Sequence, residues 1–325
     1  MISIKLEESI ENLIEHTGEL PFQSLWYQKT FVKHFCKREN LINLSFYNDG
    51  TYVGYGIFER LDNKVVLLGM KPVENGQEVT DYGDIYVSDE GKIHHREIWR
   101  KLIHWFQENK IELLQLDYVR EDALTFNLFK DKAVQATVAP YIVLPISWDE
   151  YLDSLDRVDR KELKRKIRRL ETVSYNLTCI EQPSMNNFEE FIRLHKLSSG
   201  KKNEFMTETM KNFFWDLAST EQKDWKTTIS FLKIENKNVS AVMSFENGSS
   251  ILAYNSGYDP SMNYYSVGLL LHAFKIKEAI AKGKTSYDFL RGTERYKYDL
   301  GGNDIRLFKI EIPLSRTTMA ENLKQ

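Results

Sequence analysis

The sequence predicts an α/β (α+β) protein of two similar subdomains, each a mixed, mostly antiparallel sheet flanked by helices. The chain has 325 residues, which is enough for about two domains. The same order of three strands, a helix and a short strand occurs in each half of the chain. A hydrophobic share of 42% and an aromatic share of 13% provide a large core and argue against disorder.

The first copy of this pattern begins with three strands joined by tight turns. They are Leu41–Tyr47, Thr51–Glu59 and Lys64–Leu68. The turns contain Asp-Gly and Asp-Asn pairs, which tolerate the positive φ of hairpins, and the flanks are rich in Tyr, Val and Ile. Apolar residues at helical spacing follow over His94–Asn109. Ile111–Tyr118 is a short apolar strand that carries Asp117.

The second copy repeats the order. Its three strands are Lys226–Ile234, Asn238–Phe245 and Ser250–Gly257. A helix is expected over about Ser266–Lys282, and Gly283 is placed to end it in a left-handed conformation. The strand Thr285–Leu290 then carries Asp288, at the place that Asp117 occupies in the first copy.

The repeat predicts a first subdomain over residues 1–145 and a second over residues 146–325. The boundary is expected near Pro140–Ser147, since Pro145 cannot join a central ladder and the composition changes after it. The first copy has no Ser-x-Gly helix start, so we expect that subdomain to hold no cofactor.

Composition excludes several classes of protein. Lys and Arg total 44 against 47 Asp and Glu, a net charge of −3, which argues against a globally basic nucleic-acid binder. Cys36 and Cys179 lie outside any CxxC or Cys/His cluster, and His94-His95 lacks further ligands at metal spacing, so we expect neither a disulfide framework nor a metal site. The amino terminus lacks the signal-peptide pattern, and the apolar runs fall short of the ~20 residues of a membrane helix. These features predict a cytoplasmic protein.

A strongly basic helix is expected just after the boundary, over Tyr151–Glu171. From Arg160 to Arg169 seven residues are basic, against the single acid Glu162. One interpretation is a solvated face whose long side chains cover apolar surface. The other is attraction of a polyanion: a phosphorylated substrate, a cofactor phosphate, an anionic surface or RNA. Charge attracts all of these, so the sequence leaves the partner open.

The segment Asp259–Gly268 lies between a predicted strand and a predicted helix. Ser266 is placed as an N-cap, and Gly268 falls in the first turn without a side chain to block approach. Free N–H groups and the positive end of the helix dipole favour a phosphate there, although a plain cap has the same pattern. The chain has no GxGxxG and no Walker lysine at this place, which excludes the dinucleotide and P-loop motifs.

Downstream, the segment Tyr287–Lys297 places a carboxylate in an apolar strand. Burying Asp288 is costly unless it is paired, and basic residues follow closely at Arg291, Arg295 and Lys297. Asp288 is therefore either part of a structural ion pair or a carboxylate that orients, or takes a proton from, an amine nucleophile.

These segments together resemble the CelD-like acetyltransferases of the GNAT superfamily, which are related to the FemABX aminoacyltransferases. The motifs that carry the resemblance are Tyr258-Asp259-Pro260, Tyr265-Ser266-Val267-Gly268, Asp288-Phe289-Leu290-Arg291-Gly292, Glu294 and Tyr296-Lys297. Landmarks elsewhere in the chain are Pro21-Phe22, Trp26, Asp81-Tyr82-Gly83-Asp84, Leu144-Pro145 and Leu194-His195 with Lys201 and Phe205. The resemblance thus spans nearly the whole chain.

The resemblance implies tandem GNAT-like subdomains and an N-acyltransferase. The acyl group, acetyl in the first instance, would pass from acyl-CoA to an amine, such as an amino sugar or a cell-surface polysaccharide precursor. The cofactor-binding residues would be Tyr265, Ser266, Val267 and Gly268 at the pyrophosphate, with Asn255 and Ser256 on the neighbouring strand. Backbone N–H groups of that strand would stabilise the oxyanion. The family usually has Pro at the place of Val267.

Four residues are catalytic candidates. Asp288 is the leading carboxylate. Tyr265 is by position either an acid that protonates the departing thiolate or an aromatic residue packed at the start of the helix. Lys297 resembles the lysine that contacts substrate phosphate in FemABX-type enzymes; the alternative is a surface lysine. His195, on a predicted helix Phe188–Leu197, is either a packing residue or a residue that reaches the cleft.

Two other functions remain open. One is a FemABX-like transferase that uses aminoacyl-tRNA, with Arg160–Arg169 facing the RNA; the sequence lacks the long helical hairpin typical of those proteins. The other is a non-catalytic GNAT-like module that binds an anionic ligand or a partner.

Overall fold

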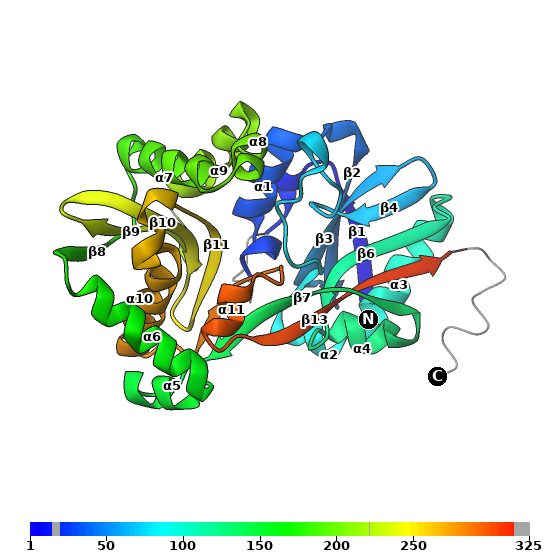
Figure 1. The fold of residues 1–325 in the computed structure, drawn as a ribbon. Helices are drawn as coiled ribbons and strands as arrows, with labels where there is room; N and C mark the ends of the chain where they lie inside the picture. Colours follow the sequence, from blue (N-terminus) through cyan, green and yellow to red (C-terminus); the bar gives the residue numbers. More distant parts are fainter. Residues whose placement is uncertain (15–19, 221, 315–325) are drawn as a thin grey trace. The chain divides into compact units, whose positions relative to one another are not determined.

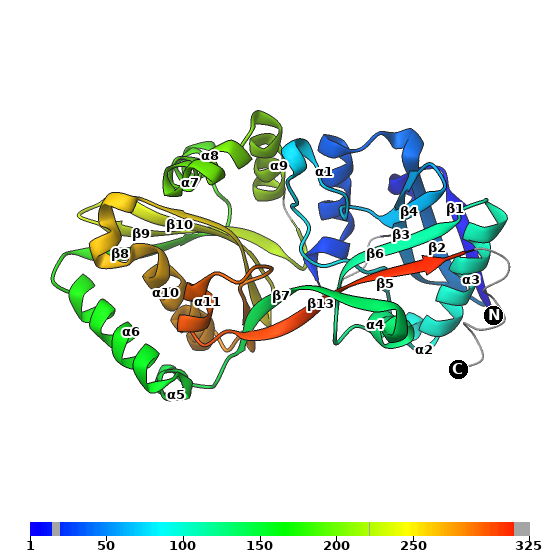
Figure 2. The same ribbon diagram turned by 45° about the vertical axis from the view of Figure 1, so that its right-hand side comes forward.

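The computed structural model describes residues 1–14, 20–220 and 222–314. The chain divides into two compact units, one of residues 1–137 with the final strand and one of residues 138–304. Figures 1 and 2 show the elements of each unit. In the part of the chain that is described, no helix has the length and apolar character needed to cross a bilayer.

The division differs from the predicted domain bounds at the end of the chain. It falls within β7 (Ala133–Val143), a few residues before the predicted boundary. The last strand, β13 (Asn303–Pro313), pairs antiparallel with β6 (Leu113–Arg120) and so joins the first unit. The strand that β13 pairs with is determined by which strand edge is open in the folded protein. The local sequence of β13 does not indicate this partner.

The first unit contains the strands in the order β1-β2-β3-β4-β6-β13. The new elements are β1 (Ile2–Glu7), β2 (Leu41–Asn48), β3 (Thr51–Leu61), β4 (Lys64–Leu67), β5 (Tyr86–Val87), α1 (Leu25–Phe35), α2 (Asp89–Ile93), α3 (His95–Glu108) and α4 (Leu124–Phe129). Helix α3 buries Ile98, Trp99 and Leu102 in the core of this unit. The three strands and the helix expected from hairpin turns and apolar spacing are confirmed.

The second unit contains the strands in the order β7-β12-β11-β10-β9-β8. They are β8 (Tyr175–Ile180), β9 (Lys226–Ile234), β10 (Lys237–Glu246), β11 (Ser250–Tyr258) and β12 (Ser286–Asp288). Figure 1 shows α7 (Met185–Ser198), α8 (Gly200–Phe205) and α9 (Glu208–Ser219) on one face of these strands and α10 (Val267–Ala281) on the other. Gly283 follows α10 with a φ of 69°, as its position after the helix predicts.

Both units contain the same arrangement of a helix and two parallel strands. In the first, β4 pairs parallel with β6 across α3; in the second, β11 pairs parallel with β12 across α10. Each parallel pairing covers only three residue pairs. The predicted repeat therefore exists in the fold.

The basic segment forms two helices, where the sequence predicted one. Helix α5 (Trp148–Ser154) ends before Leu155, and α6 (Arg157–Leu170) begins after Asp156. The ψ angles of Leu155 and Asp156, 148° and 144°, are those of extended backbone. The break turns the chain so that Leu155 joins the same core cluster as Leu163 of α6. The apolar spacing continues across the break, which is why the sequence predicts a single helix.

Candidate active site

Strands β11 and β12 separate shortly after they pair. They run together over Ser250–Leu252 and Ser286–Asp288. Phe289 N–H then donates to Pro140 O of β7 at 2.9 Å, so the chain after β12 stays beside β7. Strand β11 continues to Tyr258 with β10 as its partner. Within the described part of the chain, the far half of β11 therefore has one edge without a strand partner, and its backbone groups need other partners.

A β-bulge lies in this open part of β11. The register passes from Met243 opposite Asn255 to Ser244 opposite Ala253, which leaves Tyr254 as an extra residue. A bulge bends a strand and redirects the side chains that follow it. Asn255 and Ser256, both predicted to contact a cofactor, come directly after the bulge, and the Asn255 Oδ1 accepts a hydrogen bond from Ser256 N–H at 3.1 Å.

Side chains from α7 and α8 occupy the open edge. The Ser198 Oγ accepts from Tyr258 N–H at 2.8 Å, and Lys202 Nζ donates to Ser256 O. This approach requires Gly257, because a Cβ there would lie 2.3 Å from the Cα of His195. The edge of β11 is therefore satisfied by side chains, which can move away from it more easily than a strand can.

His195 is buried beside this edge and stays neutral. Its side chain is 1% exposed, between Phe191 and Phe205. Burial lowers the pKa of His195 to about 3; Lys202 adds to the effect and a hydrogen bond with Asn255 opposes it. Among the described residues its Nδ1 has no hydrogen-bond partner. The structure thus brings His195 to the predicted strand.

Lys202 is the residue that the sequence analysis missed. Burial lowers its pKa to about 8; the charge of Glu294 raises it, and that of Lys297 lowers it further. Lys202 belongs to a pair of adjacent lysines whose other member, Lys201, is exposed. Only the packing of α8 against β11 distinguishes the two, and a pattern of residue types does not record that packing.

Asp288 and Lys297 both hold the turn that follows β12. The Asp288 Oδ1 accepts from Leu290 N–H at 2.7 Å. Lys297 Nζ donates to the carbonyls of Leu290, Arg291 and Gly292 at 3.0, 2.8 and 3.3 Å. It also lies 2.9 Å from Glu294 Oε2, and its side chain is only 3% exposed. Both side chains thus contact the backbone of this turn, and a catalytic role for either residue stays a prediction.

The start of α10 differs from the predicted N-cap. Ser266 has a left-handed backbone, with φ 54° and ψ 39°, and its side chain does not cap the helix. The first helical bond runs from Leu270 N–H to Ser266 O at 3.0 Å. The N–H groups of Val267, Gly268 and Leu269 therefore precede the helical ladder and have no acceptor within it.

The surroundings of this first turn are partly open. Gly268 is half-buried, and a Cβ there would lie 3.1 Å from the ring of Tyr258. A cavity of about 300 Å³ reaches Leu269. Its charged lining mixes both signs: Asp159, Glu162, Lys166, Arg295 and Asp299. Tyr265 packs edge-on against Tyr264, with ring centroids 5.1 Å apart.

Comparison with known families identifies the fold of this unit. Residues 157–298 match the family model described as an acetyltransferase (GNAT) domain. The second unit has the GNAT fold. The matched segment contains the open edge of β11, Lys202 and the start of α10. Among curated protein sequences, none matches the chain.

Solved structures resemble the chain over nearly its whole length. FemX superposes with a TM-score of 0.61 at 12% identity, covering 96% of each chain. The L-PGS of Bacillus licheniformis has a TM-score of 0.56 at 13% identity, covering 94% of this chain and 95% of the other. The C-terminal domain of a putative lysylphosphatidylglycerol synthetase from Agrobacterium fabrum has a TM-score of 0.55 at 6% identity, covering 87% and 86%. At such identities the likeness shows a shared fold.

Proposed function

We propose that the second unit is an N-acyltransferase that moves an acyl group from acyl-CoA to an amine. The observation that carries the proposal is that β11 leaves β12 after three residue pairs and leads, through the short 3-10 helix Pro260–Tyr265, to the uncapped start of α10. A diphosphate would suit the N–H groups of Val267, Gly268 and Leu269, which precede the first hydrogen bond of the helix. A thioester fits the open edge of β11 near Asn255 and Ser256.

The residues at this edge support a simple order of events. The nitrogen of the amine forms a bond to the thioester carbonyl carbon, the carbon–sulfur bond breaks, and the thiolate leaves with the electron pair. A thiol pKa of about 8.5 makes the thiolate a fair leaving group. We propose that a backbone N–H group at the bulge, such as that of Ser256 once it is released from the Asn255 Oδ1, stabilises the oxyanion; one such donor is typically worth ~3 kcal/mol.

The proton of the amine needs an acceptor, and Lys202 is the best placed. With a pKa of about 8, roughly one Lys202 in ten is neutral at pH 7, and its Nζ lies at Ser256 O on the open edge. His195, with a pKa of about 3, is too weak a base. Asp288 already accepts from Leu290, which makes it a residue that positions the turn.

Binding of acetyl-CoA tests the donor site. Because a ligand that binds only the folded state stabilises it, acetyl-CoA should raise the melting temperature in a dose-dependent way. Gly268→Glu should abolish the shift through charge repulsion. Gly268→Ala is the matched control, since it introduces the same Cβ contact with Tyr258 without the charge. An equal response of both variants, or no response of the wild-type protein at millimolar acetyl-CoA, contradicts the proposed donor site.

An aminoacyl donor is the second candidate. The fold likeness to FemX over 96% of both chains favours it, and the basic helix α6 would then face RNA. Aminoacyl-tRNA binding that persists at 200 mM salt, together with no response to acetyl-CoA, supports this candidate; non-specific attraction fades steeply with salt. The acceptor, an amino sugar or a polysaccharide precursor, is proposed from the family resemblance.

A further inference from the structure

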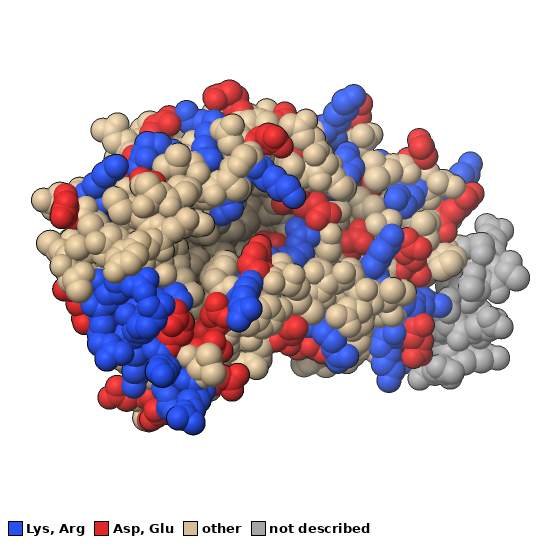
Figure 3. Space-filling view, in the orientation of Figure 1, with Lys and Arg blue, Asp and Glu red and all other residues tan. Residues whose placement is uncertain are grey.

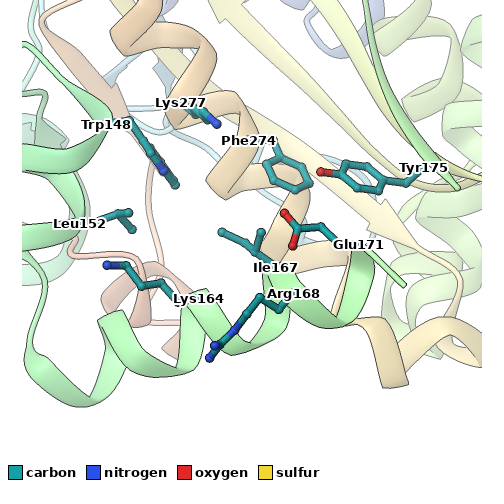
Figure 4. A pocket seen from close by; sticks show the side chains of 9 residues that line it. All are labelled: Trp148, Leu152, Lys164, Ile167, Arg168, Glu171, Tyr175, Phe274 and Lys277. Carbon is teal, nitrogen blue, oxygen red and sulfur yellow. The ribbon is translucent and has the colours of Figure 1, made fainter. Parts of the chain in front are cut away.

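A second cavity lies between α6 and α10, away from the open edge of β11. Its volume is about 380 Å³, within the range of small-molecule sites. Figure 4 shows Trp148, Ile167 and Phe274 directed toward it from α5, α6 and α10. Phe274 is stacked on Tyr175, with centroids 5.6 Å apart and rings 7° from parallel. We call this cavity the α6–α10 pocket; much of its wall is apolar and aromatic.

Three cations lie at the rim of this pocket. They are Lys164 and Arg168 of α6 and Lys277 of α10, against one acid, Glu171. Lys277 Nζ lies 5.6 Å from the centre of the Trp148 ring. The side chains of Glu171 and of the three cations are all exposed, so solvent screens the four charges alike and the excess of cations over acids decides the sign. The rim of the pocket therefore has a net positive charge.

The pairing of the α6 cations separates them into two groups. The first group has partners: Arg160 with Asp153, Arg165 and Lys166 with Glu162, and Arg169 with the carbonyl and ring of Tyr264. The second group has no ion-pair partner among the described residues: Arg157, Lys161, Lys164 and Arg168.

The second group follows helical spacing. Steps of four, three and four residues place its members on one face of α6, and this face ends at the pocket. Figure 3 shows the basic side chains gathered over α6. Cations that only solubilise a helix need no common face and no aromatic wall beside them.

We propose that the α6–α10 pocket binds a phosphate-bearing amphiphile, with its apolar group against Trp148 and Phe274 and its phosphate at Arg168, Lys164 and Lys277. Arginine suits such a phosphate because its planar fork of donors matches two oxygens at once. The site is distinct from the donor site: Phe274 and Lys277 lie roughly two to three turns along α10 from Gly268. The proposal therefore does not depend on acyl-CoA binding.

Calorimetric titration of the full chain with four probes tests this proposal. Dodecyl phosphate, below its micelle concentration, represents a lipid-like ligand, and AMP represents a nucleotide-like one. Inorganic phosphate lacks the apolar group, and dodecyltrimethylammonium reverses the charge. We expect at least one of the first two to bind about tenfold more tightly than either of the last two. Binding of dodecyl phosphate would identify a lipid as the source of the phosphate, and binding of AMP would identify a nucleotide.

Matched variants locate the binding. Arg168→Gln and Arg165→Gln each remove one positive charge from α6, but only Arg168 lines the pocket, whereas Arg165 pairs with Glu162. Arg168→Gln should weaken binding about tenfold, the range for a hydrogen bond to a charged group, and Arg165→Gln less than twofold. Trp148→Ala should weaken binding of the amphiphile and leave the circular dichroism spectrum unchanged.

Several results would overturn the proposal. They are no binding of either amphiphile, equal binding of inorganic phosphate or of the cationic detergent, and equal losses in the two arginine variants. Binding of tRNA alone, weakened equally by both variants, would likewise replace the pocket with a diffuse basic surface.

Discussion

Replacing Lys202 by methionine should make the protein more stable and far less active. Lys202 Nζ lies at the open edge of β11, where it donates to Ser256 O and is largely removed from water. Burial of a charged amine opposes folding, whereas methionine has a similar length and no charge. The same substitution removes the proposed proton acceptor. Because general-base catalysis typically raises the reaction rate at least a hundredfold, the rate of acyl transfer should fall by about that factor.

The size of the stability change follows from the pKa. Lowering the pKa of Lys202 from 10.5 to about 8 corresponds to about 3 kcal/mol at pH 7. The loss of the hydrogen bond to Ser256 O offsets about 1 kcal/mol. The free energy of unfolding should therefore rise by about 2 kcal/mol, and the melting temperature by roughly 4–8 °C for a domain of this size.

The stability difference between the wild-type protein and the methionine variant should depend on pH. Between the folded pKa of about 8 and the unfolded value of 10.5, the unfolded state binds more protons, so the stability of the wild-type protein rises with pH. The advantage of the methionine variant should be full below about pH 8 and shrink as the pH rises further. Above about pH 10.5 the variant should be less stable than the wild-type protein by about 1 kcal/mol, because the burial cost is gone and only the lost hydrogen bond remains.

Urea unfolding at pH 7, 8.5 and 10, followed by circular dichroism, measures this difference. Lys202→Arg is the control, because arginine keeps the charge and a donor for Ser256 O but cannot release a proton; it should be inactive without being stabilised. A methionine variant that is less stable at pH 7, or whose advantage does not change with pH, would refute the reasoning.

Two further substitutions test the packing of the site by urea unfolding. Lys297→Met should lower the free energy of unfolding by about 3 kcal/mol, since three carbonyls lose their donor; Arg295→Met, at a side chain 92% exposed, should change it by less than ~0.5 kcal/mol. Equal effects would show that Lys297 does not hold the turn. Gly257→Ala should cost about 3 kcal/mol, because its Cβ would lie 2.3 Å from His195 Cα and force α7 outward. Gly248→Ala, which meets nothing within 4 Å, should be nearly neutral, and similar stabilities of these two variants would contradict the close packing of α7.

Local patterns predicted most of the strands and helices because those elements are specified locally. Hairpin turns with Asp-Gly and apolar side chains at helical spacing fixed the positions of β2, β3, α3 and α10 to within a few residues. Features that depend on distant parts of the chain were not predictable in this way. The pairing of β13 with β6 and the break before Asp156 both serve a core that only the folded chain assembles.

The segments that the sequence assigned to the candidate site lie close together in the fold, and their chemistry stays a prediction. Sequence motifs indicated the end of β11, the start of α10 and the turn after β12, and these lie together in the second unit. The left-handed backbone of Ser266 and the burial of Lys297 under three carbonyls could not be foreseen. In both cases the residue type is compatible with several roles, and backbone geometry selects one of them.

The two copies of the repeated unit differ in what fills the space where the parallel strands separate. In the first unit the chain itself fills it: Gly83 N–H donates to Tyr118 O at 3.2 Å, and a Cβ at Gly83 would lie 2.3 Å from Asp117 O. In the second unit the corresponding backbone edge is satisfied by the side chains of Ser198 and Lys202. A ligand can displace a side chain by a change of rotamer, whereas displacing a packed backbone segment requires local unfolding. This difference supports our placing of the acyl-transfer chemistry in the second unit.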